Sequence, residues 1–140
     1  MAESLVHKEL VRDIRYWIEA NYQVRGLTFL WIDNCVEEGY VQQKRIDNFI
    51  PDIYARCLND NLEIIGEAKT GSDIQSRHSE EQFLSYLKYC NYSKAIFILA
   101  VPYVFRAFAK NLIGSLGSQT DTLNAHVIVI DNLMNKICRS

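Results

Sequence analysis

The chain of 140 residues has few of the residues that mark specialised sites, with two prolines, six glycines, four cysteines and three histidines. No Cys-x-x-Cys pair occurs and the histidines lie far apart, so no zinc motif is visible. Scattered cysteines favour reduced thiols and, with them, a cytoplasmic location. No glycine-rich phosphate loop follows an expected strand, which argues against a nucleotide cofactor.

Long apolar runs and an excess of one charge are also missing. A membrane span needs about 18 consecutive apolar residues, and no such run exists. The first ten residues carry charge throughout and lack the apolar core of a signal peptide. With a net charge of −2, the chain is not a polycation that coats nucleic acid. Binding to DNA therefore requires a local group of basic residues or a second subunit.

The hydrophobic residues, 49% of the chain, suffice for one core without disulfide or zinc support. The length predicts a single domain over residues 1–140. Helical periodicity predicts helices at residues 3–22, 79–91 and 103–116. Apolar, β-branched segments predict strands at residues 27–32, 48–58, 61–70, 94–101 and 126–130. This order, αβββαβαβ, predicts an α/β fold with a mixed sheet flanked by helices on both faces.

Local signals place the ends of several elements. The Asn59-Asp60-Asn61 segment predicts a hairpin turn between two strands. Ser79 and Gln82 have the spacing of a capping box for the second helix. We expect Gly117 to close the third helix, residues 33–48 to form a long loop, and residues 132–140 to form a short helix.

Three charged residues fall on the predicted hairpin. Asp52 follows Pro51 in an otherwise apolar strand, and Glu67 and Lys69 lie two residues apart near the end of the next strand. Residues two apart in a strand point to the same face. Because pairing through the turn brings Asp52 level with Glu67, the hairpin gathers two carboxylates and one ammonium group.

This set of groups suits phosphodiester hydrolysis. Two close carboxylates repel each other, and a hard cation relieves the repulsion. Mg²⁺, or Mn²⁺, bound there lowers the pKa of a bound water and offsets charge on the phosphate. Lys69 can then orient the water or stabilise the transition state. Each residue alone is more simply a solvated surface residue, but the three together favour an active site.

Pro51-Asp52, residues 53–66 and then Glu67-Ala68-Lys69 resemble the signature of the PD-(D/E)XK nuclease superfamily. Within it the chain is most similar to VRR-NUC domains, whose early glutamate and Ser-x-x-Gln match Glu3 and Ser79-Glu-Glu-Gln82, and less closely to Holliday-junction resolvases. Gln82-x-x-x-Tyr86 is also similar to the glutamine–tyrosine motif of RecB-type nucleases. The resemblance implies a restriction-endonuclease-like core and a Gln82 side chain that faces the active site.

The first helix offers two acids for the metal. Glu3 is in phase with Val6, Leu10 and Ile14, in the middle of the apolar stripe, whereas Glu9 lies on its flank. A charge in that stripe requires a partner or a metal, so Glu3 is the preferred third acid. His7 also lies on the inward side. It is either a hydrogen-bonded core histidine or a neighbour of the metal site.

Basic residues flank the expected site on loops, where a phosphate backbone has to pass. The candidates for binding nucleic acid are Lys44, Arg45, Arg56, Arg77 and His78. Because no base-reading helix or aromatic stacking motif is visible, recognition by backbone and shape is expected.

These observations predict a Mg²⁺-dependent DNA endonuclease, structure-selective or weakly sequence-specific. The expected metal ligands are Asp52, Glu67, the Ala68 carbonyl and Glu3, with Asp52, Glu67, Lys69 and Gln82 as catalytic residues. Two alternatives are a Holliday-junction resolvase proper and a non-catalytic nucleic-acid-binding or assembly module that keeps the fold. A single small domain offers little surface for branched DNA, so a homodimer is expected.

Overall fold

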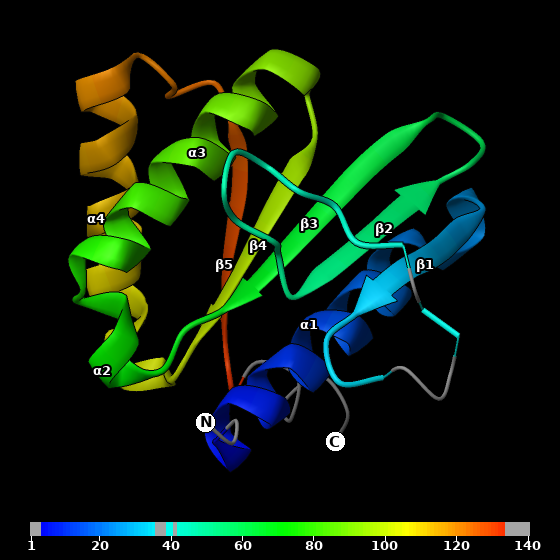
Figure 1. Cartoon of the computed structure of the whole chain (residues 1–140), viewed down its shortest axis with the longest axis horizontal. Coiled ribbons are helices and arrows are strands. Elements are labelled where there is room, and N and C mark those ends of the chain that lie inside the picture. Colours follow the sequence, from blue (N-terminus) through cyan, green and yellow to red (C-terminus); the bar gives the residue numbers. More distant parts are fainter. Residues whose placement is uncertain (1–3, 36–38, 41, 134–140) are drawn as a thin grey trace.

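A five-stranded mixed sheet forms the centre of the protein (Figure 1). The structure is a computed structural model that describes residues 4–35, 39–40 and 42–133. The strands are β1 (Leu27–Ile32), β2 (Ile53–Cys57), β3 (Leu62–Ala68), β4 (Ile96–Val101) and β5 (His126–Asp131). They lie side by side in chain order, with antiparallel pairing from β1 to β3 and parallel pairing from β3 to β5.

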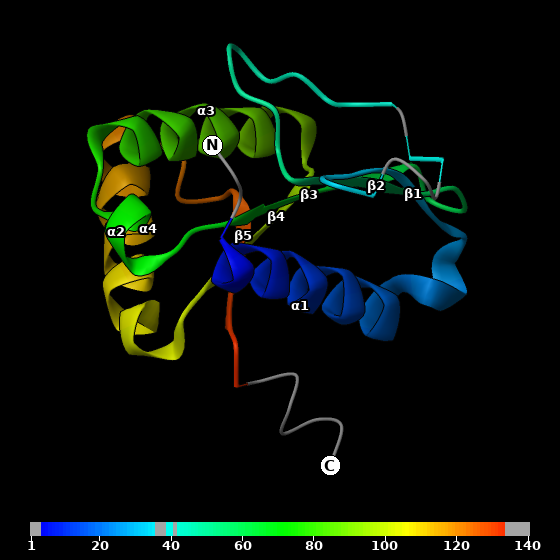
Figure 2. The same ribbon diagram turned by 60° about the horizontal axis from the view of Figure 1, so that its bottom comes forward.

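Helices cover both faces of the sheet (Figure 2). One face packs against α1 (Leu5–Tyr22), and the other packs against α3 (Arg77–Ser93) and α4 (Arg106–Thr120). Three short helical segments connect the larger elements: η1 (Gln23–Arg25), α2 (Gly71–Ile74) and η3 (Tyr103–Phe105). The α/β class and the predicted order of the main elements are therefore confirmed.

The core consists of two layers separated by the sheet. Strand β4 shows why: Ile98 packs in the same layer as Ile14 of α1, while Phe97 and Leu99 pack in the layer that contains Phe83 of α3. Every residue of β4 is buried. This explains its continuous apolar sequence, since a strand covered on both faces needs apolar residues at every position.

The first helix differs from the prediction at its beginning. It begins at Leu5, and the side chain of Ser4 caps it by accepting a hydrogen bond from the His7 amide. Val6, which we predicted to face inward, is 48% exposed, because the packed stripe begins one turn later at Leu10. The predicted acid Glu3 lies outside the described residues.

Two predicted helix ends were wrong. The second large helix is capped by Ser76, whose hydroxyl accepts the Ser79 amide, so Ser79 and Gln82 do not form a capping box. The last large helix continues through Gly117 and ends at Thr120. The next residue, Asp121, caps it with a φ of +55°. Gly117 serves packing instead, since an added Cβ there would lie 3.3 Å from the Leu123 side chain.

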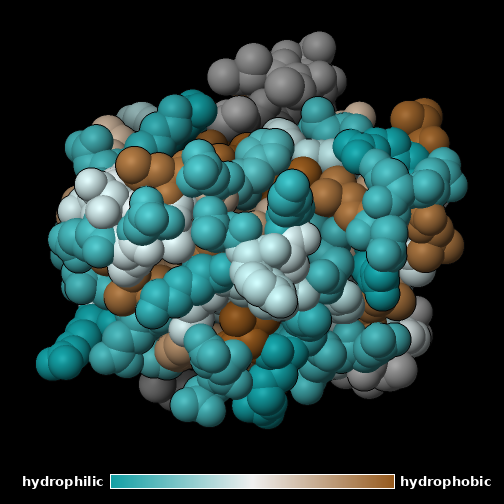
Figure 3. Space-filling view, turned by 90° about the horizontal axis from the view of Figure 1, so that it is seen from above, coloured by the Kyte–Doolittle hydropathy of each residue, from teal (hydrophilic) through white to brown (hydrophobic). Residues whose placement is uncertain are grey.

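The remaining segments agree with the prediction where they are described. The turn at residues 58–61 joins β2 to β3, and the described residues of 33–48 contain no helix or strand. The predicted tail helix falls mostly outside the described residues, which end at Leu133. Within the described part of the chain, no helix is long and apolar enough to cross a membrane. Hydrophilic side chains predominate on the face seen in Figure 3, with small hydrophobic groups between them.

Candidate active site

The β2–β3 hairpin brings Asp52 and Glu67 together. Ile53 pairs with Gly66, so Asp52 stands level with Glu67 at the end of the hairpin away from its turn. Asp52 Oδ2 accepts a hydrogen bond of 2.9 Å from the Ala68 amide. The Asp52 and Glu67 side chains are close enough for Asp52 to raise the pKa of Glu67. The sequence prediction that these two acids converge agrees with this geometry.

Glu67 is buried in a place that disfavours its charge. Burial raises its pKa well above the ordinary value, and the negative charge of Asp52 raises it further. Lys69 and His7 act in the opposite direction but do not outweigh these two effects. Because burial and the charge of Asp52 disfavour the charged form of Glu67, a cation bound beside the two acids would stabilise the folded protein.

Lys69 supplies the nearest ammonium group. Its Nζ lies 3.7 Å from Glu67 Oε2, and both side chains are almost fully buried. Its backbone amide donates to the Ala100 carbonyl on β4, which fixes the chain just beyond the end of β3. Glu67 and Lys69 therefore lie on the same face of the sheet, as their spacing predicted.

His7 contacts the acid pair from the other side of the sheet. Its Nε2 lies 3.2 Å from Asp52 Oδ2, and both side chains are mostly buried. Figures 1 and 2 show the beginning of α1 close to the C-terminal end of β3. This contact fits both possibilities for His7, a hydrogen-bonded core histidine and a neighbour of the proposed metal site. Such a contact holds a carboxylate in one orientation.

A short relay from α3 holds Glu67. Gln82 Nε2 donates to the Tyr86 hydroxyl over 3.0 Å, and that hydroxyl donates to Glu67 Oε1 over 3.3 Å. Burial, and then the nearby Glu67 charge, raise the pKa of Tyr86, so the hydroxyl remains a neutral donor. Tyr86 was absent from the predicted catalytic set, although its spacing from Gln82 was visible in the sequence.

The donors present fit a hard divalent cation. Magnesium prefers oxygen ligands and keeps several waters, and the Asp52 and Glu67 carboxylates with the Ala68 carbonyl supply such oxygens. The Ala68 amide already points to Asp52, and the carbonyl of an extended residue points to the same side of its strand. Gln82 Oε1 is buried without a hydrogen-bond partner, so it can accept from a metal-bound water.

Side chains alone do not complete a metal site among the described residues. No group of three His, Cys, Asp or Glu side chains in that part of the chain is arranged to hold a metal ion. The third predicted acid, Glu3, lies outside the described residues. Glu9, the alternative acid, is exposed. Two carboxylates and a peptide oxygen therefore form the described donor set.

The predicted basic residues fall into two groups, one of which lies near the acids. Arg77 and His78 are exposed at the start of α3, the helix that carries the Gln82–Tyr86 relay. The His78 ring lies 5.4 Å from the ring of Phe49, which in turn lies 6.4 Å from Tyr86. Arg77 pairs with Glu81 on the helix surface. Arg77 and His78 therefore lie at the end of α3 that also carries Gln82 and Tyr86.

Lys44 and Arg56 lie toward the other end of the hairpin. Lys44 Nζ is 3.4 Å from Glu63 and lies over the ring of Tyr89. Glu63 stands four residues before Glu67, about 13 Å along an extended strand. Arg56 hydrogen-bonds Asn61 beside the turn. Lys44 and Arg56 therefore have partners within the chain, and Arg45 is exposed on the loop before the hairpin. Binding of nucleic acid by these three residues stays a prediction.

Glu63 anchors the loop that carries Lys44. Burial raises the pKa of Glu63, but hydrogen bonds from Tyr89 and Tyr54 and the charge of Lys44 outweigh it and hold that pKa below its ordinary value. The two phenol groups donate to Glu63 over 2.6 and 2.7 Å. The cluster accounts for the position of Lys44 without any ligand.

Comparisons with protein-family models, with curated proteins and with solved structures found no match. Only the side chains and their arrangement therefore bear on the function of this protein.

Proposed function

We propose that this protein is a metal-dependent endonuclease of the PD-(D/E)XK type with a restriction-endonuclease-like core, acting on DNA. One observation carries the proposal: two acids, Asp52 and Glu67, share a buried site with Lys69 at the end of the hairpin. A buried acid pair of this kind costs stability, and strongly shifted pKa values of this sort are common at functional sites. Its arrangement suits a reaction at a phosphodiester.

In this proposal Asp52, Glu67 and the Ala68 carbonyl hold Mg²⁺ or Mn²⁺. When bound, the metal would supply a water of lowered pKa and would offset the negative charge of the phosphate. Lys69 orients that water and stabilises charge that develops on the phosphoryl oxygens. The water oxygen bonds to phosphorus, the bond from phosphorus to the leaving oxygen breaks, and a proton passes to that oxygen.

The surrounding residues position these groups. Tyr86, supported by Gln82, fixes one oxygen of Glu67, and His7 and the Ala68 amide fix Asp52 Oδ2. Substrate recognition is assigned to the DNA backbone, with Arg77 and His78 at the start of α3 among the candidate contacts. A homodimer would provide two such sites for branched DNA.

Cleavage assays test the proposal directly. Purified protein is incubated with linear, single-stranded and four-way-junction DNA in Mg²⁺, Mn²⁺ or EDTA. We expect metal-dependent cleavage by the wild type and a loss of at least about 100-fold in Glu67→Gln. Glu80→Gln, an exposed glutamate on α3, is the matched control and should retain full activity.

The same cleavage assays can refute the proposal. If the folded wild type cleaves none of these DNAs with either metal, the nuclease proposal is wrong and a non-catalytic binding or assembly module is the better interpretation. A melting curve for each variant separates loss of chemistry from loss of fold.

A further inference from the structure

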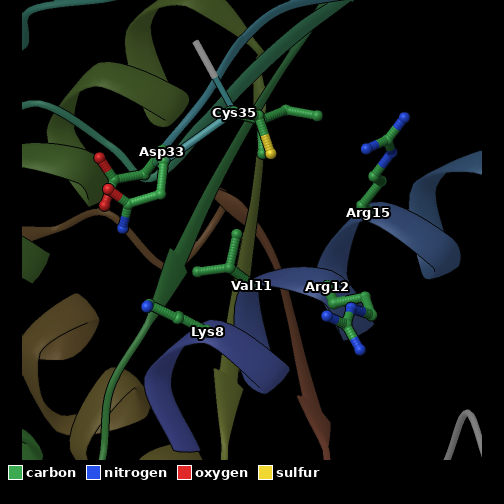
Figure 4. A pocket seen from close by; sticks show the side chains of 8 residues that line it. Lys8, Val11, Arg12, Arg15, Asp33 and Cys35 are labelled. Atoms are coloured by element: carbon green, nitrogen blue, oxygen red, sulfur yellow. The ribbon is translucent and has the colours of Figure 1, made fainter. Parts of the chain in front are cut away.

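A basic cavity lies between α1 and the residues that follow β1. Its volume is about 230 Å³. On one side it is lined by Lys8, Arg12 and Arg15 of α1, and on the other by Asp33 and Cys35 (Figure 4). None of these residues was among the predicted nucleic-acid contacts, because their spacing along a helix is also that of an ordinary solvated face.

The three cations of the cavity have different surroundings. Arg15 is held in place, with Nε 3.1 Å from Glu19 and Nη2 3.2 Å from the Tyr40 hydroxyl. Lys8 and Arg12 are exposed, and neither forms an ion pair with another described residue. Both therefore offer donors to an anion from outside, while Arg15 forms a fixed wall.

Among the described residues that line the cavity, Asp33 is the one acid. In Figure 4 its carboxylate lies across the cavity from the Arg12 and Arg15 guanidinium groups. The described lining residues thus carry three cations, one of them paired with Glu19, and one acid, although the whole chain is slightly negative. Such a local excess is what binding to nucleic acid requires of this chain.

The cavity adjoins the candidate active site through two direct links. The Asp33 amide donates to the Asp52 carbonyl over 2.8 Å. His7, the residue before Lys8, contacts the Asp52 carboxylate. Exposed helix cations are usually only solvated. Lys8 and Arg12, however, border a cavity whose rim residue Asp33 is hydrogen-bonded to the proposed metal ligand Asp52.

We propose that this basic cavity binds a phosphate group of the nucleic-acid substrate next to the bond that is cut. The inference rests on the proposed nuclease function, which it extends by naming a second phosphate site. Lys8 and Arg12 are the donors to the phosphate, and Arg15 shapes the wall. The phosphate is either an internal one of a continuous strand or a terminal one at a strand end.

The test compares Lys8→Ala/Arg12→Ala with the wild type and with the control Lys88→Ala/Lys110→Ala. The control removes two other exposed helical lysines, on α3 and α4, and so makes the same change in net charge. Affinity is measured at several salt concentrations, in EDTA and in Ca²⁺. The probes are labelled linear duplexes with a 5′-phosphate or a 5′-hydroxyl, and a covalently closed circle.

We expect the Lys8/Arg12 variant to bind at least about tenfold more weakly than the wild type. The slope of log affinity against log salt should become shallower by about one, as for the loss of one phosphate contact. A loss limited to the 5′-phosphate duplex supports a terminal phosphate, and an equal loss on the circle supports an internal one. If affinity and slope match those of the control variant, the inference is overturned.

Parallel cleavage assays keep the two proposals apart. A wild type that cleaves DNA while the Lys8/Arg12 variant binds and cleaves equally well overturns the cavity alone. A wild type that binds but never cleaves, with binding weakened by the Lys8/Arg12 changes, keeps the cavity and removes the nuclease. Because both residues are exposed, the variant should melt near the wild-type temperature, which confirms that it is folded.

Discussion

Asp52→Asn separates the proposed metal-binding role of Asp52 from its structural role. The asparagine carbonyl can still accept the Ala68 amide, which Asp52 Oδ2 now accepts over 2.9 Å. The substitution removes one of the two charged ligands and the negative charge that raises the pKa of Glu67. We therefore expect the metal-free variant to melt at the wild-type temperature or above it.

The effect of metal on the two proteins should differ widely. At about 100 times its Kd, a metal ion stabilises the folded wild type by about 2.7 kcal/mol, which raises the Tm of a domain of this size by roughly 10 °C. Loss of an outer partner alone weakens a metal site by about 10–100-fold, so loss of a charged ligand should cost at least the upper value. A hundredfold weaker site leaves about 0.4 kcal/mol at the same metal concentration, or one to two degrees by the same conversion.

Thermal melts in EDTA, Mg²⁺, Mn²⁺ and Ca²⁺ provide the assay, and Ca²⁺ should stabilise the protein without supporting cleavage. Asp47→Asn is the control, because Asp47 is exposed and has a φ of +53° that asparagine also tolerates. Equal metal-induced shifts in Asp52→Asn and the wild type would place the metal elsewhere. A wild-type Tm that does not move in millimolar metal would refute the metal site altogether.

Three further predictions concern other acids and the tyrosine. Tyr86→Phe removes the hydroxyl that holds Glu67 and should lower the cleavage rate about 10–100-fold with a small change in Tm; full activity would show that the relay does not position Glu67. Glu63 has a lowered pKa in the folded state, so its contribution to stability is present above its ordinary pKa and is lost as pH falls through the folded value. Urea unfolding as a function of pH should therefore show a shallower acid limb for Glu63→Gln, and an unchanged limb would contradict this. Glu3→Gln should weaken metal binding and cleavage sharply, whereas Glu9→Gln, on an exposed residue, should change both little; the reverse result would assign the helical acid to Glu9.

The sequence contained enough information to predict the hairpin and the meeting of Asp52 with Glu67. Strand alternation and the turn at residues 59–61 are local signals, and the register follows once both ends of the turn are known. The apolar run of β4 likewise predicted a strand covered on both faces.

Contacts between elements that are distant in the sequence were harder to predict. His7 reaches Asp52 only because α1 packs at one particular position under the sheet, and no periodicity gives that position. The role of Lys44 depends on two tyrosines from β2 and α3 that meet at Glu63. Gly117 has the residue type of a helix end, but the closeness of Leu123 explains it better. In each case tertiary packing decides among options that are locally equivalent.

The way in which four side chains, Asp52, Glu67, His7 and Tyr86, come together has a consequence for folding. His7 comes from the first helix, the acids come from a central hairpin, and Tyr86 comes from a helix on the opposite face. These side chains come together only when the sheet has assembled with a helix on each side. Catalytic competence should therefore appear late in refolding and together with global structure, since contacts of long sequence separation are slow to form. Recovery of activity would then report completion of the whole fold, more faithfully than the return of helical signal alone.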